Sequence, residues 1–386
     1  SHRWSASTVS DTASKMVWPS RTKLILLSSR AATTVQGYEE PCGMGEGALE
    51  SPLPCRKQPW VREHRGVTAT VSPLEQLSEA LRAELGAKAV TELARLSGGA
   101  SRETWSFRAD DRPLILQRQR KGDIRDMGVE ARVVQAAFNA GVPVPELIAN
   151  GSGDIGLAFM ILSHIEGETI ARKILRDEQF AEARSGLVAQ SAHALAALHS
   201  IDASTITGLP SIDQVQQYRE TLDNLNTALG QAHPTFELAF RWLERNRPTS
   251  TRTALVHGDF RLGNLMVGPD GLRAVLDWEL AHIGDPIEDL GWLCVRAWRF
   301  GATKPVAGLG EYETLIAEYE KASGLKVDRE VVRWWEVLGT LKWGIMCMVQ
   351  TSSHVLGMSR SHELAAIGRR VCENEYDLFV ALDGKW

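Results

Sequence analysis

Cysteine is scarce in this chain, and it has neither a long apolar run nor an excess of positive charge. Five cysteines among 386 residues, with no CxxC pair, are too few and too scattered for a disulfide scaffold or a zinc site. The longest clean apolar stretch, residues 157–162, is far below the ~20 residues of a membrane-spanning helix. The net charge is −5, whereas a nucleic-acid-binding protein needs a basic face. We therefore expect a cytoplasmic globular protein with reduced thiols and no membrane or nucleic-acid partner.

The first 66 residues differ in composition from the rest. They carry nine basic and six acidic residues, and they are rich first in Ser and Thr and later in Gly and Pro, without a sustained apolar period. Such a segment buries too little apolar surface to offset its chain entropy. We expect residues 1–69 to be a disordered extension, or a start assigned too far upstream. A transit peptide is the alternative, favoured by the acid-poor start and opposed by the lack of an amphipathic stripe.

Residues 70–166 have the pattern of a β-rich lobe. Four leucines at helical spacing follow Ser72 and Pro73, which suit the start of a helix. The run GSGDIG at 151–156 spells GxGxxG, but a strand follows it instead of a helix, so it predicts a hairpin turn and not a dinucleotide site. The expected helices span 73–85 and 126–139, and the expected strands span 90–96, 104–108, 113–119, 147–149 and 157–165.

Residues 167–386 are mainly helical in pattern and rich in tryptophan. Three short strands are expected at 255–256, 265–267 and 274–276, around a dense polar cluster. The predicted class is therefore α+β, with an antiparallel sheet lobe that contains one main helix, followed by a mostly helical lobe. The tryptophans either pack between helices or line a pocket. Those in question are Trp278, Trp292, Trp298, Trp334, Trp335 and Trp343.

The polar cluster has the composition of a phosphoryl-transfer site. Asp259 and Asn264 lie five residues apart on a loop between apolar strands, and Asp277 follows at the end of a second short strand. A strand–turn–strand returns the chain to the loop, so two carboxylates and one amide oxygen meet. One Asp can accept the proton of an attacking hydroxyl, and an Asn–Asp pair can hold Mg²⁺. Asp and Asn also favour turns, but the third member and the flanking strands argue against that simpler interpretation.

The runs HGDFRLGN at 257–264 and VLDWELAHIGDPIEDLGW at 275–292 resemble the aminoglycoside phosphotransferase family, small-molecule kinases with a protein-kinase-like fold. The closest likeness is to the subgroup that includes the kinase-like domains of some acyl-CoA dehydrogenases, and it covers about residues 75–380. The resemblance implies that Asp259 is the catalytic base, that Asn264 and Asp277 are metal ligands, and that His257 supports the catalytic loop. It also implies that four further residues brace the site, namely Arg261, Glu279, Asp285 and Asp289.

The nucleotide is expected on the side of the first lobe. Gly98, Gly99 and Ser101 lie between the first two strands, where the family has its phosphate-covering loop. Small residues there let backbone N–H groups approach phosphate. Ser163 and Ile165 fall on a segment that resembles the hinge between lobes, whose backbone binds adenine.

A cation for the phosphates is expected from the third strand, paired with a carboxylate on the following helix. This strand, LILQRQR at 114–120, has no Lys. We select Arg118 with Glu130 as its partner, since Arg can hold phosphate through a bidentate fork. Because strand faces alternate, a shift of one residue would place Gln117 inward instead.

These parts predict an enzyme that transfers phosphate from ATP or GTP, with Mg²⁺, to a hydroxyl group of a small molecule. The subgroup resemblance favours a hydroxylated metabolite such as a hydroxyacyl thioester over an antibiotic. A protein kinase is disfavoured, because the GDP run begins only seven residues after Asp277 and leaves no room for a long activation segment. The remaining alternative is a catalytically inactive nucleotide-binding protein, although such proteins usually lack one of the catalytic groups present here.

Overall fold

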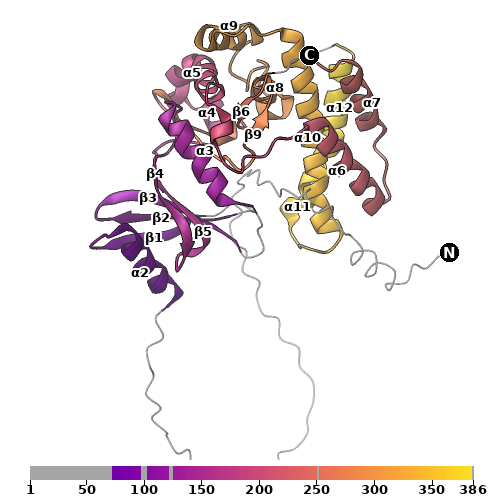
Figure 1. Cartoon of the computed structure of the whole chain (residues 1–386). Coiled ribbons are helices and arrows are strands. Elements are labelled where there is room, and N and C mark those ends of the chain that lie inside the picture. The colour runs from indigo at the N-terminus through magenta and orange to yellow at the C-terminus, as the bar shows by residue number, and fades with distance from the viewer. Residues whose placement is uncertain (1–71, 97–101, 121–124, 250–251, 385–386) are drawn as a thin grey trace, which may run out of the picture.

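The computed structural model describes residues 72–96, 102–120, 125–249 and 252–384. The expected extension and the loop with Gly98, Gly99 and Ser101 therefore lie outside the described residues. Figure 1 shows a twisted sheet with two helices beside a larger group of helices, with the sheet formed by the earlier part of the chain. The predicted α+β class, a sheet lobe followed by a helical lobe, is confirmed.

The first lobe contains a five-stranded antiparallel sheet in the order β1-β2-β3-β5-β4. The turn between β2 and β3 uses Asp110 and Asp111, both at positive φ, a conformation that Asp tolerates. The GxGxxG run forms the turn between β4 and β5, as predicted, with Gly153 opposite Gly156. The strands are β1 (Val90–Leu96), β2 (Arg102–Ala109), β3 (Arg112–Gln119), β4 (Leu147–Gly153) and β5 (Gly156–Ser163).

The two faces of this sheet have different neighbours. α2 (Pro73–Leu85), which starts at a capping box on Ser72, packs Leu77 and Leu81 against one face. That face carries Leu114 and Leu116 of β3, and both are almost fully buried. The opposite face is covered in part by α3 (Met127–Asn139), whose Met127 and Ala131 contact Met160 of β5. Successive residues of β3 therefore alternate between α2 and the side that faces the second lobe.

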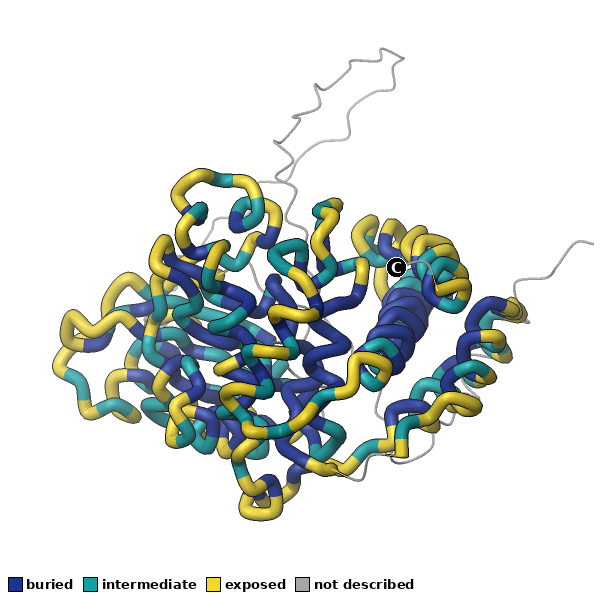
Figure 2. The backbone as a smooth tube through the Cα atoms, turned by 90° about the horizontal axis from the view of Figure 1, so that it is seen from above, coloured by how far each residue is buried: buried dark blue, intermediate teal, exposed yellow. Residues whose placement is uncertain are grey.

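The second lobe is built around one long buried helix, α10 (Arg329–Val355). Every residue from 336 to 350 is buried, and the helix contacts α6, α7, α8, α11 and α12. Figure 2 shows such buried backbone in the interior, with exposed turns at the rim. No helix of the described chain is long and apolar enough to cross a membrane. The other helices are α4 (Ala171–Arg176), α5 (Ala181–His199), α6 (Gln214–Leu229), α7 (Pro234–Arg245), α8 (Ile287–Cys294), α9 (Tyr312–Ser323), α11 (His362–Ile367) and α12 (Arg370–Leu382).

Two small antiparallel pairs of strands hold the polar cluster. β6 (Ala254–Val256) pairs with β9 (His282–Gly284), and β7 (Leu265–Gly268) pairs with β8 (Gly271–Val275). The loop at 257–264 connects β6 to β7, and the segment with Asp277 connects β8 to β9. The two connections therefore lie side by side, as the sequence predicts.

The packing of α2 can be tested with two leucines on the same helix. Leu81 is fully buried, whereas Leu74 is 46% exposed. We expect Leu81→Ala to lower the free energy of unfolding by about 2–5 kcal/mol, because it leaves a cavity under the sheet. Leu74→Ala should change it by less than about 0.5 kcal/mol. Urea unfolding of both variants measures this, and equal losses would contradict the packing described.

Candidate functional site

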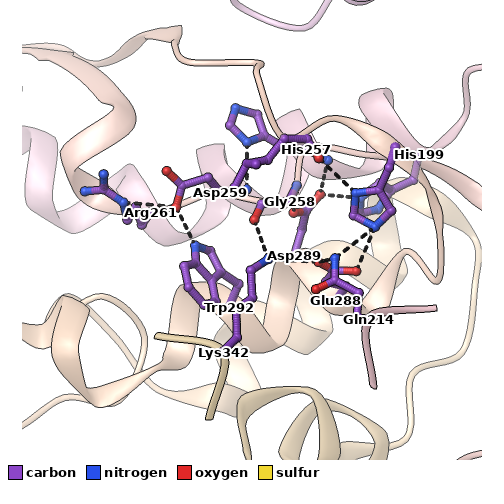
Figure 3. A network of polar contacts seen from close by, with 12 residues as sticks. His199, Gln214, His257, Gly258, Asp259, Arg261, Glu288, Asp289, Trp292 and Lys342 are labelled. Carbon is purple, nitrogen blue, oxygen red and sulfur yellow. Dashed lines mark hydrogen bonds and ion pairs between the residues drawn. The ribbon is translucent and has the colours of Figure 1, made fainter. Parts of the chain in front are cut away.

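The loop at 257–264 is held through its backbone. Gly258 adopts φ +77°, and a Cβ atom there would lie 2.6 Å from the carbonyl oxygen of Leu280, so only glycine fits. The fully buried carboxylate of Asp289, on α8, accepts hydrogen bonds from the backbone N–H of His257 at 2.8 Å and of Gly258 at 2.9 Å. Figure 3 shows Asp289 beside this loop. Asp289 therefore contacts this loop through two of its backbone N–H groups, and its role as a brace stays a prediction.

The charge state of Asp289 depends on its histidine neighbours. Burial raises the pKa of Asp289, but the hydrogen bond and charge of His199 outweigh it, together with His257, so its pKa is lowered overall. His199, at the end of α5, lies 3.2 Å from Asp289 through Nε2 and 2.9 Å from the Tyr319 hydroxyl through Nδ1. Asp289 is therefore a buried carboxylate whose direct partners come from α5 and the loop, and Tyr319 holds His199 from the opposite ring nitrogen.

His257 connects the loop to the second connection. Its Nε2 lies 3.1 Å from the Leu276 carbonyl, and its Nδ1 accepts the backbone N–H of Asp259 at 3.1 Å. Burial lowers the pKa of His257, which fits a neutral ring that donates from Nε2 and accepts at Nδ1. These contacts give His257 a supporting place next to Asp259.

The Asp259 carboxylate receives three side-chain donors. Its Oδ1 accepts from Arg261 Nε at 3.1 Å and from Trp292 Nε1 at 2.9 Å, and its Oδ2 accepts from Asn264 Nδ2 at 2.6 Å. Figure 3 shows Arg261 and Trp292 directed at this carboxylate. The role of Trp292 is missed by the sequence, in which it is only one of several tryptophans. Its contact depends on α8 packing against the loop, which no local spacing reveals.

Asn264 and Asp277 form the candidate metal pair. The backbone N–H of Leu276 donates to the Asn264 carbonyl at 2.8 Å, which joins the two connections, and both side chains line the same cleft. Burial, followed by the neighbouring charge of Glu279, raises the pKa of Asp277 to about 8. A carboxylate in such surroundings favours a bound cation, and two hard oxygen donors fit Mg²⁺ that takes its other ligands from phosphate and water. The described residues contain no cluster of three or more His, Cys, Asp or Glu placed to hold a metal.

The predicted ion pair between Arg118 and Glu130 is wrong. Glu130 of α3 instead accepts from Arg102 of β2, with 2.5 Å between Nη1 and Oε1. Arg118 binds Glu103, with 2.6 Å between Nε and Oε2. The reason is the alternation of β3. Arg118 shares the face of Leu114 and Leu116, whereas Gln117 faces the cleft, which is the second register left open by the sequence.

The two remaining residues that were predicted to brace the site are Asp285, at the start of α8, and Glu279, between the two lobes. Asp285 accepts the backbone N–H of Ile287 at 2.9 Å at the start of α8. Glu279 is ion-paired with both Arg102 and Arg125, so it connects the segment between β8 and β9 of the second lobe to the first lobe. Both residues therefore hold elements in place and do not line the cleft.

One large cleft, of about 2270 Å³, lies between the lobes. Its walls include the predicted hinge residues Ser163 and Ile165, and Ser163 is fixed by accepting the backbone N–H of Glu146 at 2.9 Å. Asp259 lies immediately behind two lining residues, Arg261 and Asn264. The far end of the cleft is formed by α11, α12 and the segment at 296–303. Of the tryptophans that the sequence left undecided, Trp298 and Trp343 line this end of the cleft, and Tyr376 lies with them.

Residues 92–335, more than half of the chain, match the model of the phosphotransferase enzyme family. The chain belongs to this family. It is 30% identical over 238 residues to acyl-CoA dehydrogenase family member 10 of Mus musculus, with 58% of this chain and 22% of that protein aligned. The chain spans less than half the length of the curated relatives that head the comparison. This phosphotransferase therefore matches only one part of those larger proteins.

Solved structures share the fold of this phosphotransferase. A Ralstonia eutropha protein described as a candidate aminoglycoside phosphotransferase superposes with a TM-score of 0.64 at 22% identity, covering 80% of this chain and 98% of that one. A spectinomycin phosphotransferase in complex with ADP and spectinomycin has a TM-score of 0.58 at 12% identity, with 80% and 98% covered. At these identities the likeness establishes the fold alone, and the family match establishes that the chain is a member of the phosphotransferase enzyme family.

The Asp289 brace makes a prediction about stability. Asp289→Asn leaves one buried donor poorly paired, so we expect the free energy of unfolding at pH 7 to fall by about 1–3 kcal/mol. Because the pKa of Asp289 is lowered, its contribution is present above pH 3.8 and is lost as the pH falls through its folded-state value. The variant should therefore lose less stability than the wild type below pH 4. Urea unfolding at several pH values measures this, with the exposed Asp154→Asn as control. An equal loss of the free energy of unfolding below pH 4 in the wild type and in Asp289→Asn would contradict the prediction.

Proposed function

We propose that this phosphotransferase moves the γ-phosphoryl group of ATP or GTP to a hydroxyl group of a small molecule, with Asp259 as the base. The observation that carries this proposal is the 2.6 Å hydrogen bond between Asp259 and Asn264, combined with the backbone bond that joins Asn264 to the Asp277 segment. These two bonds support an arrangement with Asp259 as base and Asn264 and Asp277 as oxygen donors at one wall of the cleft. The proposed hinge between the lobes lines the same cleft.

The nucleotide would occupy the part of the cleft next to the sheet. The segment at 163–165 lines this part of the cleft, which supports it as the place for the purine ring, and a structural neighbour with the same fold is a complex with ADP. Asn264 and Asp277 would hold Mg²⁺. When bound, Mg²⁺ would neutralise charge on the phosphates.

Arg102 is the best-placed cation for the phosphates. It lines the cleft from β2 and is fixed by Glu130 of α3, the arrangement that kinases build with a Lys of the third strand and a helix Glu. Its planar guanidinium can bind two phosphate oxygens at once. Gln117, which stands at the inward position of β3, lies 3.3 Å from Arg102 and carries no charge.

The acceptor would enter from the end of the cleft formed by α11 and α12. Its hydroxyl can reach Asp259 Oδ1 by displacing Arg261, whose 3.1 Å contact is the longest of the three to this carboxylate. Asp259 takes the hydroxyl proton as the oxygen bonds to the γ-phosphorus, and the nucleoside diphosphate leaves. The aromatic lining and a volume above the ~300–1,000 Å³ of ordinary ligand pockets suit a nucleotide plus a sizeable acceptor. The matched acyl-CoA dehydrogenase relative makes hydroxyacyl thioesters the first acceptors to screen.

Two aspartates should separate catalysis from binding. Asp259→Ala should abolish transfer and leave the ATP-induced rise in melting temperature nearly unchanged, because Asp259 does not line the nucleotide end of the cleft. Asp277→Ala should remove the magnesium-dependent part of that rise, since a ligand bound only by the native state stabilises it. Thermal-shift titrations with ATP and GTP, with and without Mg²⁺, measure binding, and release of the diphosphate measures turnover. Wild-type turnover in both variants would reject these roles, and binding without turnover in the wild type would favour an inactive nucleotide-binding protein.

Two arginines test which strand supplies the cation. Arg102→Met should weaken ATP binding by about tenfold or more, because loss of a charge-assisted contact costs roughly 1.5–3 kcal/mol. Arg118→Met serves as the matched control and should change the affinity by less than twofold, since its guanidinium binds Glu103 on the other face of the sheet. Calorimetric titration with ATP and Mg²⁺ measures both. The reverse order of effects would restore the assignment made from the sequence.

A further inference from the structure

A fully enclosed lysine lies directly behind the catalytic loop. Lys342 is at the middle of α10, inside the stretch in which every residue is buried, and only 3% of the residue is exposed. Placing an ammonium group in a protein interior is costly unless it is paired and hydrogen-bonded. The contacts that it makes there show what offsets this cost.

The ammonium group of Lys342 contacts the loop more closely than it contacts its counter-charge. Nζ donates to the Gly258 carbonyl at 2.9 Å, whereas the nearest oxygen of Glu288 is 3.4 Å away. Nζ also lies 4.5 Å from the centre of the Trp292 ring, in cation–π range. Figure 3 shows Lys342 beside Trp292 and next to Gly258.

Glu288 is itself held in place and is not free to follow the lysine. Its Oε1 accepts from Gln214 Nε2 at 2.7 Å, and its Oε2 lies 3.0 Å from His282 Nε2. Glu288 belongs to α8, as do Trp292 and Asp289. Lys342 therefore connects α10 to α8, the helix that also carries Asp289 and Trp292, which contact the loop.

We propose that Lys342 is a positioning residue for Asp259. It acts by two routes, through the Gly258 carbonyl that precedes Asp259 and through the ring of Trp292, whose indole N–H donates to Asp259 Oδ1 at 2.9 Å. Asp289 fixes the N–H groups of this part of the loop, and Lys342 fixes its carbonyl from the other side. The inference rests on the proposed role of Asp259 as base.

The test uses a charge-balanced variant, because Lys342→Met alone leaves Glu288 buried with one counter-charge fewer and can fail to fold. The double variant Lys342→Met/Glu288→Gln removes both charges. Lys321→Met, on α9 with its side chain 73% exposed, is the matched control. Turnover is measured as ADP release from ATP and Mg²⁺ with water as acceptor, and the indole N–H signal of Trp292 is followed by NMR after assignment through Trp292→Phe.

For the double variant we expect a fall of about 10- to 100-fold in kcat, the size of effect that a small misplacement of a catalytic group produces. The KM for ATP should change by less than twofold, and the Trp292 indole signal should shift. Lys321→Met should change none of these. A purely structural lysine would lower the melting temperature and leave kcat per folded molecule unchanged.

Three results would overturn the inference: wild-type kcat in the folded double variant, a loss confined to KM, or an unmoved indole signal. If the wild type releases no ADP under any condition, the proposed function fails and not this inference alone. The indole signal then decides only the structural part of the inference: a shift supports coupling of Lys342 to Trp292, the partner of Asp259, and no shift rejects it.

Discussion

The site depends on one buried carboxylate. Asp289 accepts two consecutive backbone N–H groups at the start of the loop at 257–264, where Gly258 adopts a conformation that other residues avoid. Without an internal acceptor, these two donors would be buried unpaired. Because Asp289 and Trp292 both belong to α8, the same helix fixes the backbone before Asp259 and one oxygen of its side chain.

Charge is concentrated where the two lobes meet. Arg102 of the sheet lies between Glu130 of α3 and Glu279, and the nearby half-buried Asp277 has further carboxylates around it. Burial and the neighbouring carboxylates raise the pKa of Asp277, and under the proposed function a bound divalent cation would offset this negative charge. Arg102 belongs to the sheet lobe, and its charge lowers the pKa of Asp277 in the second lobe. The position of the sheet lobe therefore affects the charge of one member of the candidate metal pair.

Much of this could be predicted because it is local. The order of sheet and helices follows from periodicity, the hairpin at 151–156 follows from the strand after it, and the meeting of Asp259, Asn264 and Asp277 follows from a short strand–turn–strand. Local patterns did not suffice for Arg118, which pairs with Glu103 and not with Glu130. The sequence limits the inward side chain of β3 to alternate positions, but it does not say which set faces the cleft. The packing of Leu114 and Leu116 under α2 decides that.

The sequence by itself determined the class of fold, the family and the choice of Asp259, Asn264 and Asp277 as candidates, because these depend on the periodicity of single elements and on motifs within residues 257–292. Only the tertiary structure decided that Arg102 replaces Arg118 beside Glu130, that Trp292 donates to Asp259, and that Lys342 supports Gly258. These contacts join residues 28, 33 and 84 positions apart. The physical reason is that a buried polar side chain takes whatever partner packing brings within reach, and packing between distant elements has no local signature.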